Sequence, residues 1–144
     1  MILQTNSKLL PAIQQYGCGY MVCAWYAIIC RGWEIDDVRE LNDKYKTAVS
    51  IGAMTDNCFV QDWTLLMRIV GLDAEYTGRH EPKDRICQTG EIEILRFPGH
   101  FVAGNGRGEV TYDPWGRSYA VQTGQVKSKR IFRIKDDKLW RVSA

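Results

Sequence analysis

The spacing of apolar residues changes along the chain from a helical period to a strand-like period. In the first half, a strongly apolar run predicts a buried helix over residues 18–29 that stops at Gly32. Apolar residues at intervals of three or four predict two further helices, over residues 34–45 and 60–70. Gly71 is well placed to end the last of these helices.

The second half alternates apolar and polar residues over short segments separated by turn residues. Asn105-Gly106-Arg107-Gly108 is a strong hairpin signal between two such segments. The glycine spacing of residues 104–108 does not indicate a nucleotide site, because a strand follows it where a helix would be required. The predicted strands cover residues 92–97, 101–103, 110–112, 119–122 and 130–134. Helices followed by a meandering antiparallel sheet of about five strands predict an α+β fold.

Length and composition fit one ordinary globular domain over residues 1–144. The chain is 45% hydrophobic and 25% charged, which are typical values for a folded protein. Its net charge of +2 is too small to indicate a nucleic-acid partner. Residues 127–141 hold seven Lys and Arg against two Asp. The simplest interpretation is a solvated strand face and tail, and the alternative is a patch that recruits an acidic partner.

The five cysteines do not favour a metal site or a disulfide framework. They are an odd number without a C-x-x-C pair, and the chain has only two histidines, so neither a metal nor another cofactor is expected. No signal peptide precedes them, which favours a reducing compartment. The longest apolar run is too short to span a bilayer, which takes about 20 residues. We therefore expect a cytoplasmic protein without membrane contact.

Two histidines and five cysteines limit the candidates for nucleophilic chemistry. His80 lies in a polar segment and is predicted to be a solvated loop residue, whereas His100 follows Pro98-Gly99 and opens an apolar strand. Cys18 stands at the first turn of the most apolar helix, where free N–H groups and the helix dipole favour a thiolate. Cys58 precedes the third helix and is the reserve candidate. The remaining cysteines are expected to be packing residues or without a role: Cys23, Cys30 and Cys87.

Asp113 is the residue best placed to orient the imidazole of His100. The two residues stand about four positions either side of the predicted hairpin turn, so their side chains are expected to meet. Taken alone, Asp113-Pro114 would be a turn starter. Together with Cys18 it completes a nucleophile, a base and an orienting carboxylate, which is the logic of acyl transfer.

These residues carry a resemblance to papain-like cysteine peptidases, in particular to the peptidases that process bacteriocin leaders at a double glycine. The chain also resembles small uncharacterised phage- and plasmid-borne bacterial proteins. The helix-then-sheet order agrees over essentially the whole chain. Two segments carry the likeness: Gln14-Gln-Tyr-Gly-Cys18-Gly-Tyr-Met-Val-Cys-Ala, and Gly99-His100-Phe-Val-Ala-Gly with Val110-Thr-Tyr-Asp113-Pro-Trp-Gly.

The resemblance implies roles for further residues near the thiol. A glutamine about six residues before the cysteine supplies the oxyanion donor in the family. Here Gln14 and Gln15 lie four and three residues before Cys18, so the loop is shorter and either residue is a candidate. Trp115 is a candidate to cover the bond between His100 and Asp113, although a core role is equally compatible with its sequence position.

Three functions remain open from the sequence. The first is a cysteine hydrolase, a peptidase or amidase, acting on a peptide or protein substrate with a Cys-His-Asp triad. The second is acyl transfer to an amine with the same triad, as in transglutaminase-like relatives. The third is a non-catalytic binding module of phage or plasmid origin that engages a host protein. A complete set of Cys18, His100 and Asp113 favours an enzyme. The sequence determines neither the substrate nor the oligomeric state.

Overall fold

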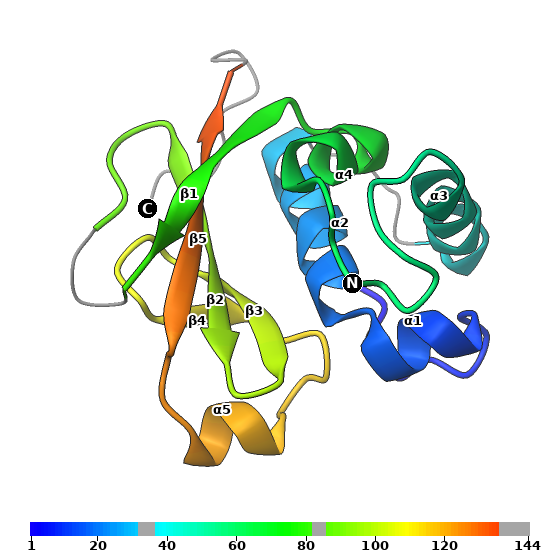
Figure 1. Ribbon diagram of the computed structural model, residues 1–144. Helices are drawn as coiled ribbons and strands as arrows, with labels where there is room; N and C mark the ends of the chain where they lie inside the picture. Colours follow the sequence, from blue (N-terminus) through cyan, green and yellow to red (C-terminus); the bar gives the residue numbers. More distant parts are fainter. Residues whose placement is uncertain (32–36, 82–85, 136–144) are drawn as a thin grey trace.

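The computed structural model describes residues 1–31, 37–81 and 86–135, which form a mixed α+β fold. Four helices come first along the chain and the sheet follows, with one short helix before the last strand. Figure 1 shows the first four helices gathered on one side of the molecule and the sheet on the other. The predicted α+β class is therefore confirmed.

The helix boundaries follow from capping residues. The carboxylate of Asp62 accepts a hydrogen bond from the Leu65 N–H, so the helix predicted over residues 60–70 begins later, and Gly71 ends it with a φ of 109°. The helix predicted from residue 34 is capped by Asp37, and Gly32 lies outside the described residues. The observed helices are α1 (Pro11–Tyr16), α2 (Cys18–Arg31), α3 (Val38–Ser50), α4 (Trp63–Val70) and α5 (Tyr119–Thr123).

The sheet is antiparallel throughout, with the strand order β1-β5-β2-β3-β4. A two-residue turn joins β2 to β3, where Pro98 fixes the backbone and Gly99 adopts a φ of 67°. Asn105–Gly108 lie in the loop between β3 and β4, as predicted. The strands are β1 (Ala74–His80), β2 (Glu91–Phe97), β3 (His100–Gly104), β4 (Val110–Tyr112) and β5 (Ser128–Ile134).

Two predictions about the sheet were wrong, although the number of strands agrees. Residues 119–122 lie in α5, because the Ser118 hydroxyl accepts a hydrogen bond from the Val121 N–H and starts a helical turn. His80 ends β1, a strand that the sequence did not indicate, and is not a loop residue. In this edge strand only Ala74 is buried, the following residues alternate between exposed and half-buried, and Gly78 interrupts the apolar pattern.

The helical layer meets the sheet through α2, which is almost fully buried. A Cβ atom on Gly19 would lie 3.2 Å from Trp63 and 3.3 Å from Phe101. The absence of a side chain therefore lets α2 approach β3 closely. None of the helices in the described part of the chain is long and apolar enough to cross a membrane.

A buried ion pair fixes the loop between β3 and β4. The carboxylate of Glu93 accepts hydrogen bonds from the N–H groups of Gly106 and Gly108, at 2.9 and 2.8 Å, and lies 3.0 Å from the Lys129 ammonium. A Cβ on Gly104 would lie 2.4 Å from the same carboxylate. The glycines of residues 104–108 thus surround the carboxylate of Glu93. Lys129 is buried, so the prediction that it belongs to a solvated face was wrong.

Glu93→Gln should destabilise the protein by about 3–5 kcal/mol, because it leaves the Lys129 charge buried without its partner. Denaturant unfolding followed by circular dichroism measures the change. Glu75→Gln is the matched control, since Glu75 forms a similar pair with Lys135 at 2.9 Å on the exposed surface. Equal effects of the two substitutions would contradict the structural role of Glu93.

Candidate active site

Cys18 is held at the start of α2 by a tight connection from α1. Gly17 is the one residue between the two helices, and its N–H donates to the Ile13 carbonyl at 2.8 Å. A Cβ atom on Gly17 would lie 2.6 Å from the same carbonyl oxygen, so a larger residue would clash with Ile13 in α1 and disturb this connection. Cys18 therefore stands at the positive end of the α2 dipole, as the sequence predicted.

The sulfur of Cys18 is positioned against β3. The backbone N–H of Phe101 donates a hydrogen bond to Cys18 Sγ at 3.4 Å. His100 directly precedes Phe101 in the strand, so the thiol and the imidazole come from elements far apart in sequence. The close approach of α2 at Gly19 makes this juxtaposition sterically possible.

His100 and Asp113 form a buried pair. His100 Nε2 lies 2.7 Å from Asp113 Oδ1, and the two residues are 7% and 8% exposed. Burial lowers the pKa of His100, but hydrogen bonds to Cys18 and Asp113 outweigh it, so that the pKa is raised. Since Nε2 faces Asp113, Nδ1 is the ring nitrogen that remains for Cys18.

Asp113 is held by more donors than the imidazole alone. Its Oδ1 accepts from the Trp115 N–H at 3.0 Å, and its Oδ2 accepts from both the N–H and the hydroxyl of Ser118, at 3.0 and 2.6 Å. Burial raises the pKa of Asp113, but the hydrogen bonds from Ser118 and His100 reverse the effect and lower it. The carboxylate is thereby kept ionised and its orientation is fixed.

Ser118 is a site residue that the sequence analysis missed. It orients Asp113 with its hydroxyl and caps α5 with the same atom. The helix-capping signal of Ser118 was present in the sequence, but it was obscured because residues 119–122 were interpreted as a strand.

The three glutamines near the thiol are placed differently. Gln14 donates to the Leu9 carbonyl at 2.6 Å and is not among the described residues that line the cleft around Cys18. Gln15 lines that cleft from the exposed end of α1. Gln4, which the sequence analysis did not consider, lines it as well. Gln4 is 1% exposed, its amide donates to the Gln14 carbonyl, and its oxygen has no hydrogen-bond partner in the described structure.

The cleft around Cys18 has a volume of about 640 Å³, which is in the usual range for a ligand site. The catalytic candidates Cys18 and His100 both line it. Trp115 supports Asp113 through its backbone, while its side chain lines the cleft and is 49% exposed. Other exposed aromatic residues also line the cleft: Tyr16, Phe59 and Tyr119.

The other cysteines are less suited to nucleophilic chemistry. Cys23 and Cys30 are buried in α2 as predicted, and burial raises the pKa of Cys30 to about 12. Cys58 lines the same cleft, but burial, together with the charges of Cys18 and Asp56, raises its pKa to about 12. The described residues contain no cluster of His, Cys, Asp or Glu side chains that could hold a metal ion.

The structure thus joins a cysteine, a histidine and an aspartate at one cleft between a helix and a sheet. A family model described as "Protein of unknown function, DUF261" matches residues 1–134, and the chain belongs to this family. No curated protein and no solved structure matches the chain.

Asp113→Asn should lower the pKa of His100, because it removes the negative charge beside Nε2. A titration of the histidine ring resonances by NMR measures this, with the second histidine, His80, as an internal reference. Asp73→Asn, an exposed change outside the site, is the control. An unchanged His100 titration in Asp113→Asn would show that the carboxylate does not stabilise the imidazolium.

The raised pKa of His100 also has a consequence for stability. Because the folded-state value lies above the unfolded value of about 6.5, the contribution of His100 is fully present below that pH and is lost as pH rises through the folded-state pKa. Asp113→Asn should reduce this loss, which unfolding curves recorded across the same pH range would detect.

Proposed function

We propose that this protein is a cysteine hydrolase with a papain-like arrangement, acting on a peptide or another amide. The observation that carries the proposal is the chain of contacts from sulfur to carboxylate. Phe101 N–H holds Cys18 Sγ beside His100, whose Nε2 lies 2.7 Å from Asp113. A nucleophile, a base and an orienting group within hydrogen-bond reach are the requirement for covalent acyl transfer.

In the proposed reaction, Cys18 Sγ attacks the carbonyl carbon of the substrate and forms a tetrahedral intermediate. The imidazolium of His100 then donates its proton to the leaving amine, and the C–N bond breaks to leave a thioester. Water attacks the thioester while His100 accepts a proton from it, and the acid is released as the thiolate returns. Asp113 keeps the ring of His100 oriented through both steps.

The aromatic residues around the cleft favour a peptide or protein substrate. Tyr16, Phe59, Trp115 and Tyr119 line the cleft, and Phe59 and Tyr119 are 71% and 81% exposed. Such large apolar side chains are typical of binding surfaces, where they are covered by a partner. An extended chain lying across the cleft would cover these side chains.

Acyl transfer to an amine requires the same triad, and the two reactions differ in what captures the thioester. Mass spectrometry of the products in the presence and absence of a primary amine separates them. The binding-module alternative predicts neither turnover nor a selectively reactive thiol.

Cys18 should be alkylated fastest of the five cysteines at neutral pH. It contacts His100 and lines the cleft, whereas burial raises the pKa of Cys23, Cys30 and Cys58. Limiting iodoacetamide followed by peptide mapping measures the five rates. Cys18→Ser should abolish turnover, and His100→Gln should slow both alkylation and turnover.

Cys30→Ser is the matched control for the alkylation experiment, because it removes a thiol from the same helix outside the cleft. If Cys58 reacts fastest, the nucleophile assignment moves there. If no thiol reacts faster than an exposed model cysteine, the enzyme proposal fails and the binding module is favoured.

Gln4→Ala should lower turnover by roughly 10²–10³-fold and leave the iodoacetamide rate nearly unchanged, because alkylation builds no oxyanion. We favour Gln4 over Gln15 because its buried Nε2 is held by a hydrogen bond to the Gln14 carbonyl, and the second N–H of the same amide group is the preorganised donor that oxyanion stabilisation requires. Steady-state kinetics of Gln4→Ala, Gln15→Ala and Gln14→Ala compare the candidates. A comparable loss confined to Gln15→Ala would identify that residue instead.

A further inference from the structure

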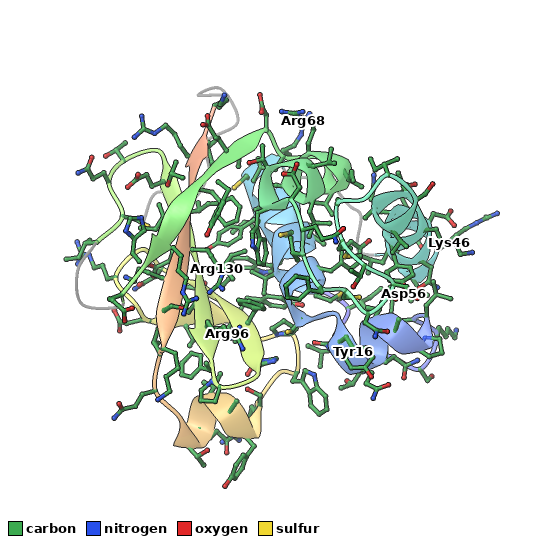
Figure 2. All side chains as sticks on the ribbon, viewed as in Figure 1. Tyr16, Lys46, Asp56, Arg68, Arg96 and Arg130 are labelled. Carbon is green, nitrogen blue, oxygen red and sulfur yellow. The ribbon has the colours of Figure 1, made fainter. Side chains whose placement is uncertain are left out.

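Two arginines project from the sheet into the cleft that contains Cys18. Arg96 of β2 and Arg130 of β5 both line this cleft. Their guanidinium carbons lie 5.3 and 4.9 Å from the centre of the Phe101 ring. Figure 2 shows both arginines on the sheet side of the molecule, well apart from Arg68 on α4.

The arrangement brings like charges together. Arg130 is paired across the strands with Arg79 of β1, and both Arg96 and Arg130 lie on the same aromatic ring. Burial lowers the pKa of Arg130, Tyr76 opposes this, and the charges of Arg79 and Arg96 lower it further. Like charges directly opposite in a sheet are destabilising, so the fold alone does not favour this cluster.

No carboxylate in the described part of the chain forms an ion pair with Arg96 or Arg130. Among the described residues, the one hydrogen bond of these guanidinium groups runs from Arg130 Nη1 to Ser128 Oγ, at 2.9 Å. By contrast, Arg133, three residues further along β5, approaches Glu91 to 3.9 Å. A guanidinium group carries five donors, so most of this pair's hydrogen-bonding capacity remains for a ligand in the cleft.

Phe101 contacts both the thiol of Cys18 and the two arginines. Its backbone N–H contacts Cys18 Sγ at 3.4 Å, while its ring lies beneath both guanidinium groups. Phe101 therefore separates the arginines from the sulfur, with the thiol at its backbone and the guanidinium groups at its ring. Consecutive residues of an extended peptide advance by about 3.3–3.6 Å, so one or two residues together with an acidic side chain bridge this separation.

We propose that Arg96 and Arg130 select a substrate with an Asp or Glu side chain at the first or second residue before the bond that is cleaved. The inference rests on the proposed function of Cys18 and adds a substrate class to it. A carboxylate matches the planar donor fork of a guanidinium group and would neutralise the cluster. If the two arginines served only to stack on the Phe101 ring through cation–π contacts, no acidic ligand would be required.

Matched peptidyl electrophiles test the proposal. Two pairs of peptidyl vinyl sulfones carry Glu or Gln at the first or second residue before the reactive group, and their rates of Cys18 labelling are measured by mass spectrometry. The Glu probe of at least one pair should react about tenfold or more faster than its Gln partner, a ratio that added salt reduces. Arg96→Gln and Arg130→Gln should each bring this ratio close to one.

Arg68→Gln is the matched control, because it removes the same charge from an exposed position on α4 and should keep the wild-type ratio. For each variant, the labelling rate with the Glu probe is divided by the rate with the Gln probe, so a general loss of reactivity cancels. Labelling of Cys18 by both probes at equal rates in the wild type, or a preference that survives both arginine substitutions, overturns the acidic-substrate proposal alone. Absence of selective Cys18 labelling by iodoacetamide and by every probe overturns the proposed function itself.

Discussion

The buried carboxylate of Glu93 is the interaction on which the arrangement of the site depends. It binds the loop between β3 and β4 through the N–H groups of Gly106 and Gly108, and it neutralises Lys129 on the neighbouring strand. The loop closes one end of the β3–β4 hairpin, and the imidazole and the orienting carboxylate lie at the other end. A fixed hairpin register is therefore what brings those two groups to 2.7 Å.

The thiol comes from the opposite layer, so the site also requires a short distance between helix and sheet. Gly19 provides it, because any side chain there would meet Trp63 and Phe101. The N-terminal segment links the same two layers, since the Gln4 N–H donates to the Pro114 carbonyl at 2.9 Å. The Gln4 side chain lines the same cleft as Cys18, so this segment connects the turn that carries Asp113 to the surroundings of the thiol.

The sequence predicted those parts of the fold and site that depend on local signals. Cys18 could be placed at a helix start because glycines flank an apolar run, and His100 and Asp113 could be paired because a hairpin turn stands midway between them. Ser118 and Gln4 could not be found in this way. Ser118 caps α5, whose residues 119–122 were predicted as a strand, and Gln4 reaches the cleft only through the tertiary fold.

Strand alternation places a buried, neutralised lysine on one face of the sheet and two half-buried arginines on the other. Lys129 and Arg130 are neighbours in β5, and successive residues of a strand point to opposite faces. Lys129 pairs with Glu93, a contact that stabilises the hairpin. Arg130 joins Arg96 over Phe101 on the cleft face, and no carboxylate of the described chain pairs with either of them. The lysine is therefore satisfied within the fold, whereas the two arginines stay half-exposed at the cleft, which is the arrangement that the proposed acidic substrate requires.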